Sequence, residues 1–275
     1  MLIFDKEEEK VRFLSLSSGS NGNCYYLSNG IVSLIIDFGI GVRTAKKRLT
    51  EHGIDINEID LVLVTHDHID HIKHLGSFAE RYMKPVYATE SLHKALSDHF
   101  VTRGKIGAFK KIIEAETPSE YKGVKITPFP VPHDGTDNYG YHIEISGIRV
   151  TLATDVGAVT ETVLKYASMA NHLVFESNYD CEMLQGGSYP KMLIERISNG
   201  KGHLSNKQSA EAIGKIYHKG MKSLLLCHLS ANNNNPELAY KTASQSLVSA
   251  GATPGENILL ECLPRGASSK MYILD

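Results

Sequence analysis

The segment VLVTHDHIDHIKHL, residues 62–75, contains four histidines and two aspartates that directly follow a run of apolar residues. The VLVT run is typical of a strand, in which alternate side chains share one face. His66, His68 and Asp70 should therefore point one way and His71 the other. For all four side chains to converge, the chain has to turn between His68 and His71.

A helix-like run beginning near Ile72 supplies the turn that this convergence needs. The segment can then present His66 with His68, and Asp70 with His71, to two adjacent points. Neutral imidazole and carboxylate are good ligands for zinc, manganese and iron. Since the chain has only 13 histidines, three of them within six residues favour a metal site over a solvated polar turn.

The two other possible metal donors of the segment, Asp67 and His74, are less suited to bind a metal. Asp67 points off the shared face, so we expect it to face away from the metals. His74 lies beyond the turn, where it either supports a ligand from behind or belongs to the surface.

One loop cannot complete the ligand shells of two metals, so further donors should come from other strand ends. Four polar residues each follow an apolar run, which is where loops gather functional groups. A buried charge without a partner would be costly at such positions. These residues are Asp37 in IIDFG, His133 in FPVPHD, Asp155 in VTLATD and His228 in SLLLCH.

The composition of the 275-residue chain sets broad limits on its class. Apolar residues make up 42%, enough for a large core, and the net charge of −2 excludes a globally basic nucleic-acid-binding protein. None of the four cysteines forms a CxxC pair, so we expect reduced thiols rather than a zinc ribbon. The start, MLIFDKEEEK, turns acidic too soon for a signal peptide, and no run is long enough to span a membrane. We therefore expect a cytoplasmic protein.

Short apolar runs alternate with amphipathic stretches along the whole chain. This alternation, with two β-rich halves that each carry helices, predicts two sheets face to face with helices outside. No linker divides the chain, so we expect one domain over residues 1–275. Strands are expected at 11–16, 24–28, 31–38, 59–65, 85–89, four times within 111–155, at 172–177, 222–228 and twice near the end; helices at 42–53, 74–83, 90–100, 160–168, 188–198, 206–220 and 235–251.

The histidine segment THDHIDH resembles the T-H-x-H-x-D-H signature of the metallo-β-lactamase-fold hydrolases, and the four strand-end residues match the other motifs of that family in order. The resemblance covers nearly the whole chain. It implies an α/β (α+β) fold, a four-layer αββα sandwich with the site at one edge of the two sheets. It also implies two divalent metal ions per chain, zinc or manganese, with iron possible.

The resemblance also implies a role for each polar residue of the site. His66, His68 and His133 would bind the first metal, Asp70, His71 and His228 the second, Asp155 would bridge both, and Asp37 would orient a histidine from behind. An aspartate at the bridging position argues against a true β-lactamase, which usually carries cysteine there.

Finer motifs are similar to those of the bacterial YycJ/WalJ subgroup, whose members are described as 5′→3′ DNA exonucleases. These motifs are SLSSGSNGNCYYL, HDGTDNYGY, FESNYD, GHLSN and CHLSANNNNPELA. Tyr179 departs from the pattern, which more often has histidine there, so no catalytic role is carried over to this position.

The expected activity is hydrolysis of a phosphodiester by a metal-bound hydroxide. Asp70 could orient the hydroxide. His203, in GHLSN, is the candidate for a phosphate contact or for the proton donor to the leaving oxygen.

Four further residues are candidate substrate contacts. Asn178 and Ser177 could line the pocket. Ser20 and Asn21 belong to the glycine-rich run SSGSNGN, whose backbone donors could meet a phosphate. A plain tight turn explains that run equally well.

Three functional hypotheses stay open. The first is a DNA exonuclease, the second a phosphodiesterase for small cyclic or ester phosphates, and the third a non-catalytic metal-binding scaffold. A glyoxalase II is disfavoured because the C-terminal part of this chain contributes His228 to the site. A redox di-iron role is disfavoured because no flavin-binding domain is evident. The expected partner is DNA or another phosphodiester substrate, with no membrane and no obligate protein partner.

Overall fold

A computed structural model describes residues 10–275 of the chain. The prediction that the chain starts without a targeting segment concerns MLIFDKEEEK, so it falls almost entirely outside the described residues. Within them, no helix combines the length and the apolar character that a membrane crossing requires.

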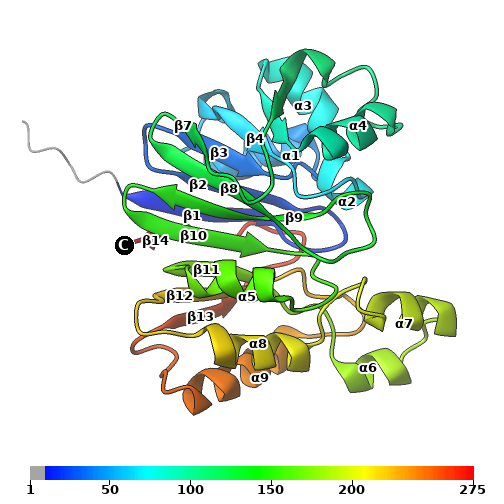
Figure 1. Ribbon diagram of the computed structural model, residues 1–275, viewed down its shortest axis with the longest axis vertical. Helices are drawn as coiled ribbons and strands as arrows, with labels where there is room; N and C mark the ends of the chain where they lie inside the picture. The colour runs from blue at the N-terminus through cyan, green and yellow to red at the C-terminus, as the bar shows by residue number, and fades with distance from the viewer. Residues whose placement is uncertain (1–9) are drawn as a thin grey trace, which may run out of the picture.

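The strands among residues 10–275 form two seven-stranded sheets that pack face to face (Figure 1). The first sheet has the order β14 (Tyr272–Leu274), β1 (Val11–Ser17), β2 (Cys24–Ser28), β3 (Ser33–Ile36), β4 (Leu61–Leu63), β5 (Val86–Ala88) and β6 (Lys110–Ile112). The second has the order β13 (Leu259–Cys262), β12 (Ser223–Cys227), β11 (His172–Glu176), β10 (Ile148–Ala153), β9 (Tyr139–Ile145), β8 (Val124–Pro130) and β7 (Ser119–Tyr121).

Helices cover the outer face of each sheet (Figure 1). The first sheet is covered by α1 (Val42–Glu51), α3 (Leu75–Tyr82) and α4 (Glu90–Asp98). The second is covered by α5 (Glu161–Ser168), α8 (Asn206–Ile216) and α9 (Pro236–Ser249). The helices α2 (Ile69–Ile72), α6 (Cys181–Gly186) and α7 (Lys191–Ser198) lie on one side of the sandwich (Figure 1). The predicted αββα architecture is confirmed.

The apolar runs of the sequence are buried on both faces of the sheets. In β3, Leu34 and Ile36 belong to the core between the sheets, while Ile35 belongs to the core under the helices. A strand covered on both sides has no polar face, which explains its continuous apolar run. Burying each such side chain stabilises the fold by about 1.5–3 kcal/mol.

Two groups of parallel strands place one edge of the sandwich at the carboxyl ends of both sheets. Strands β3 to β6 run parallel in the first sheet, and β10 to β13 in the second. Loops that leave the carboxyl ends of parallel strands gather at one edge, where ligands bind in α/β folds.

Several elements differ from the sequence-based expectation. Helix α7 begins at Lys191 rather than at 188, and α8 ends at Ile216 rather than at 220. The turn after His68 begins at Ile69 rather than near Ile72, so the predicted start was wrong by three residues. Neither β7 nor α6 was predicted. The polar β7 forms only because it pairs with β8 in a hairpin, and α6 begins where the side chain of Asp180 accepts hydrogen bonds from the first turn.

Candidate metal centre

Five strands deliver a polar side chain to the same edge of the sandwich. They are β3 with Asp37, β4 with His66, β10 with Asp155, β11 with Glu176 and β12 with His228. All five side chains are buried. The prediction that donors gather at strand ends therefore describes the geometry well.

Three of these residues have a left-handed backbone conformation. The φ angles are 60° at Asp37, 55° at Asp155 and 54° at His228. Non-glycine residues in this region cost on the order of 1–3 kcal/mol, and such strain persists only where the surrounding structure holds it. Here the left-handed residue ends each strand and re-aims the side chain toward the common site.

The histidine segment turns as its sequence requires. His66 leaves β4, His68 is the N-cap of α2, and His71 lies within the helix. The imidazole centroid of His66 lies 4.7 Å from that of His68 and 4.1 Å from that of His71. One short helix therefore brings both halves of the segment to one place.

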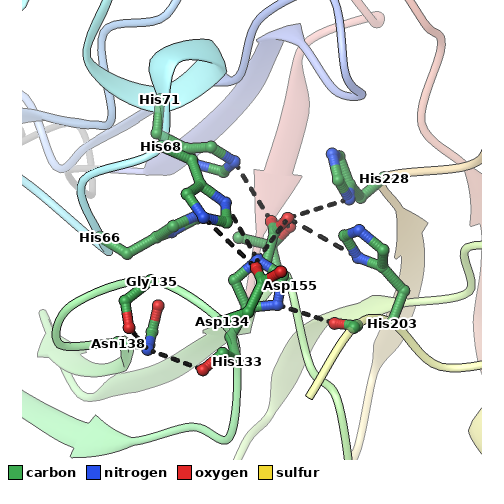
Figure 2. A network of polar contacts seen from close by, with 12 residues as sticks. His66, His68, His71, His133, Asp134, Gly135, Asn138, Asp155, His203 and His228 are labelled. Carbon is green, nitrogen blue, oxygen red and sulfur yellow. Dashed lines mark hydrogen bonds and ion pairs between the residues drawn. The ribbon is translucent and has the colours of Figure 1, made fainter. Parts of the chain in front are cut away.

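The candidate ligands form overlapping groups around Asp155, with side chains from the two halves of the chain on opposite sides of it (Figure 2). In each group the donor atoms lie within 4.8 Å of one another. The groups are His66, His68 and His133; Asp70, His71 and His228; His66, His71 and Asp155; and Asp155, Glu176, His203 and His228.

Four of these histidines make a hydrogen bond through Nδ1. The Nδ1 partners are Thr65 Oγ1 for His66 (2.9 Å), Asp37 Oδ2 for His71 (2.7 Å), the Gly202 carbonyl for His133 (2.7 Å) and Glu176 Oε1 for His228 (3.1 Å). Such bonds orient metal-binding imidazoles.

Two buried nitrogens of the centre have no hydrogen-bond partner among the described residues. They are Nε2 of His66 and Nε2 of His228, although buried polar atoms are nearly always paired. Both belong to the groups of nitrogen and oxygen donors. These residues therefore fit a divalent metal centre.

Asp37 is fully buried behind the ligands and accepts three hydrogen bonds. Its Oδ1 accepts from the Thr65 amide (2.8 Å), and its Oδ2 from the Thr65 hydroxyl (2.8 Å) and His71 Nδ1 (2.7 Å). This is the geometry that the predicted role of orienting a histidine requires.

The carboxylates of the site govern how its imidazoles bind protons. Burial disfavours the charged form of His228, but Asp155, Asp70 and Glu176 outweigh burial and raise its pKa to about 10. The pKa of His71 is raised for the same reason, against burial, chiefly by Asp155 and Asp37. Since metal ligands must be unprotonated, metal binding has to displace these protons.

Glu176 is a central residue that the sequence reading missed. It is fully buried, and its Oε1 accepts from His203 Nδ1 (2.9 Å) and His228 Nδ1 (3.1 Å). Its Oε2 accepts from the amides of Val156 (2.9 Å) and Leu204 (3.0 Å). Its position at the end of the apolar run HLVF was the available signal, the same one that identified the other strand-end residues.

His203 stands beside the metal candidates and shares a carboxylate with one of them. Burial opposes its protonation, but the bonded Glu176 outweighs burial and raises the pKa of His203. Nδ1 of His203 is hydrogen-bonded to Glu176, and the residue lines the cavity over the centre.

A cavity of about 250 Å³ opens over the centre, and two of the four predicted substrate contacts line it. Ser20 and Asn178 line it, and Asn178 Nδ2 also donates to the His228 carbonyl (2.7 Å). Asn21 and Ser177 are not among its described lining residues. Ser177 is buried and its hydroxyl donates to Asn206 (2.7 Å), while Asn21 is exposed in the glycine-rich turn.

Three further polar residues lie outside the centre: Asp67 and His74 of the histidine segment, and Tyr179. Asp67 faces away, as predicted, and accepts from the Thr136 amide (3.0 Å). His74 caps α3 and is not in any donor group among residues 10–275. Tyr179 is buried, and its backbone pairs with Ser205.

The cavity also contains residues that the sequence reading did not select. Asp134 Oδ1 lies 3.3 Å from His68 Nε2, and Asp134 Oδ2 accepts from Arg196 Nε (2.6 Å). Arg196 lies on α7, and Tyr189 precedes that helix.

Comparisons with known proteins agree with this architecture. The beta-lactamase superfamily domain model matches residues 33–229, more than half of the chain. The metallo-beta-lactamase fold protein YhfI from Bacillus subtilis superposes with a TM-score of 0.69 at 16% identity, over 94% of this chain and 99% of that one. At that identity the likeness shows the fold alone.

Two curated relatives are similar over nearly their whole length. Exodeoxyribonuclease YycJ of Bacillus anthracis is 34% identical over 247 residues, which are 90% of this chain and 92% of that protein. Exodeoxyribonuclease WalJ of Streptococcus pneumoniae serotype 2 is 32% identical over 240 residues, 87% of this chain and 89% of that protein. The chain therefore belongs to the metallo-β-lactamase-fold hydrolases, in the subgroup that is similar to YycJ and WalJ.

Proposed function

We propose that the protein is a dinuclear metal-dependent phosphodiesterase that degrades DNA from the 5′ end. One observation carries this proposal: His203, held by the buried carboxylate of Glu176, stands in the same cavity as the metal-ligand groups. Metal ligands beside a positioned proton donor suit hydrolysis of a phosphodiester, in which an alkoxide must leave.

The proposed ligand set follows the donor groups. His66, His68 and His133 would hold the first metal, Asp70, His71 and His228 would hold the second, and Asp155, which belongs to donor groups on both sides, would contribute to both. Zinc or manganese suits these ligands, and iron is a third choice. When bound, such ions neutralise charge on phosphate oxygens and make a water more acidic.

The chain's own residues bind, orient and move protons around the scissile phosphate. Asp70 orients the attacking water, and His203 donates the Nε2 proton to the leaving oxygen. Glu176 accepts the Nδ1 proton of His203 and, against the effect of burial, raises the pKa of the imidazole, which stabilises the imidazolium form whose Nε2–H is donated. Asn178 and Ser20, which line the cavity, are proposed substrate contacts, with Ser177 and Asn21 as weaker candidates.

The choice of DNA rests on the relatives. YycJ and WalJ are both named exodeoxyribonucleases, and each is matched along about nine-tenths of its length. A small cyclic or ester phosphate is the second candidate substrate, since a cavity of about 250 Å³ is at the small end for ligand pockets.

The test starts from metal-free protein that is reloaded with zinc or manganese. It is offered single- and double-stranded DNA labelled at the 5′ or the 3′ end, beside bis(p-nitrophenyl) phosphate. We expect stepwise release of 5′-terminal nucleotides, which the 5′ label reports first. Cleavage of the small ester alone would move the proposal to a small substrate. Full activity of a His68→Ala, Asp155→Ala double variant would contradict the catalytic proposal.

A further inference from the structure

Helix α7 forms one wall of the cavity with one face only. Leu193, Arg196 and Ile197 line the cavity, and their spacing of three and four residues places them on one side of a helix. The opposite side of α7, with Lys191, Glu195 and Ser198, is exposed. The wall thus combines two apolar side chains with one cation.

Arg196 is the one lysine or arginine among the described residues that line this cavity. It faces a strongly acidic surrounding that contains Asp70, Asp134 and Asp155. Its Nε donates to Asp134 (2.6 Å). A guanidinium carries five N–H donors, and no other hydrogen bond of Arg196 is recorded within residues 10–275. Both terminal amino groups therefore stay available to a ligand.

A purely structural role explains this arrangement poorly. The Arg196 side chain is 60% exposed, and exposed ion pairs contribute little to stability. The α7 helix has no buried residue that such a pair would need to hold in place. The Asp134 contact instead fixes the plane of the guanidinium, which suits two-pronged recognition of an oxyanion.

The position of Arg196 is tied to that of the proposed proton donor. The His203 amide donates to the Ile197 carbonyl (2.8 Å), at the end of α7. Gly202 packs so closely on this turn that an added Cβ would lie 2.2 Å from the Ile197 carbonyl oxygen. The last turn of α7 and His203 therefore keep a fixed separation.

We propose that Arg196 is a specificity-determining residue that binds a substrate phosphate other than the scissile one. Asp134 orients the guanidinium, and Leu193 and Ile197 face the attached nucleoside. This inference rests on the proposed function and deepens it. The same phosphate chemistry has two sources, a 5′-terminal phosphate monoester or the neighbouring backbone diester.

The test compares 5′-phosphorylated and 5′-hydroxyl oligonucleotides of one sequence, with the metal-loaded wild type and Arg196→Gln. We expect kcat/KM to fall about 10- to 100-fold, the effect of one charge-assisted hydrogen-bond pair, mainly through KM. A loss confined to the 5′-phosphorylated strand assigns the terminal phosphate, and an equal loss on both strands assigns the diester. Arg196→Lys should restore only part of the loss, because it lacks the planar fork.

Lys191→Gln is the matched control, since it removes an exposed cation from the same helix without touching the cavity lining. It should behave as the wild type, and equal kcat/KM for Arg196→Gln and wild type on both strands would overturn the inference. Failure of the wild type to cleave either strand would refute the proposed function instead. Binding of non-hydrolysable phosphorothioate strands then decides about Arg196: weaker binding by Arg196→Gln supports the inference, and equal binding overturns it.

Discussion

The two sides of the metal centre are built from very different amounts of chain. On one side, His66, His68, Asp70 and His71 come from one strand end and a helix of four residues. On the other side, each polar residue comes from a different strand or loop of the second sheet. The first side forms whenever a short segment turns, whereas the second forms only when the whole sheet is in register.

The hydrogen bonds behind the ligands show the same contrast. On the first side, two residues orient His66 and His71: Thr65 Oγ1 contacts both imidazoles, and Asp37 bonds to His71. On the second side, Glu176 alone serves two imidazoles and two backbone amides. The second side therefore depends on one buried carboxylate, and a change there should disturb several groups together.

The largest effect should follow from Asp155→Ala, which removes the residue that both sides share. We expect hydrolysis of DNA and of bis(p-nitrophenyl) phosphate to fall more than about 100-fold, since loss of a partner behind a ligand already costs 10- to 100-fold. Bound metal, measured by mass spectrometry, should fall as well. Asp98→Asn, on the exposed end of α4, is the control, and normal metal content in Asp155→Ala would contradict the ligand assignment.

Glu176→Gln should damage the second side alone. We expect kcat for DNA to fall about 10²- to 10⁴-fold, the range for a lost general acid, because His203 loses its orienting carboxylate. The small ester should lose less, through the disturbance of His228 alone, since p-nitrophenolate leaves without a proton. A comparison of the two substrates measures this, with Glu182→Gln on α6 as control. Equal losses on both substrates would argue against a proton donor.

Asp37→Asn should weaken the first side by a smaller amount. Its carboxylate accepts the Nδ1 proton of His71 (2.7 Å), and removing such a partner lowers metal affinity about 10- to 100-fold. Competition with a chelator measures that affinity. Affinity within about twofold of the wild type would show that Thr65 alone can orient the ligands.

The smallest expected effect is on the pH dependence of stability. It comes from a histidine outside both sides of the metal centre. Burial lowers the pKa of His142, whose Nδ1 bonds to Thr151 Oγ1 (2.8 Å) and whose Nε2 has no partner among the described residues. The unfolded chain, with a histidine pKa of about 6.5, binds the proton more readily. The free energy of unfolding should therefore fall as the pH drops below about 6.5.

Urea titrations of metal-free protein at pH 5 and pH 7.5 test this expectation. His142→Gln should lose less stability between the two pH values than the wild type. His99→Gln, at a partly exposed histidine, is the matched control and should keep the wild-type slope. Identical slopes for wild type and His142→Gln would show that other groups set the pH dependence.

The sequence predicted the first side better than the second for a physical reason. A strand followed by closely spaced histidines is a local pattern, and the direction of each side chain follows from it. Asp37, His133, Asp155 and His228 could be selected because each follows an apolar run. Their joint convergence required the parallel strands of both sheets, which no local pattern contains.

Glu176 and Arg196 were not predicted as site residues from the sequence, for opposite reasons. Glu176 looks like an ordinary strand end, and its importance appears only when its complete burial and four hydrogen bonds are known. Arg196 looks like an ordinary surface residue of an amphipathic helix, and only its place in the cavity distinguishes it. The helix start at Ile69 was misplaced because a histidine N-cap without a side-chain hydrogen bond gives no strong sequence signal.

The left-handed residues at the strand ends have a consequence for how this protein can be engineered. At Asp37, Asp155 and His228, glycine would relieve the backbone, so each native residue is a poor choice for folding alone. A library of variants selected only for heat resistance without metal should lose these three residues early. Directed evolution of a more thermostable variant must therefore select for metal binding in every round. Otherwise it will yield stable proteins that no longer bind metal.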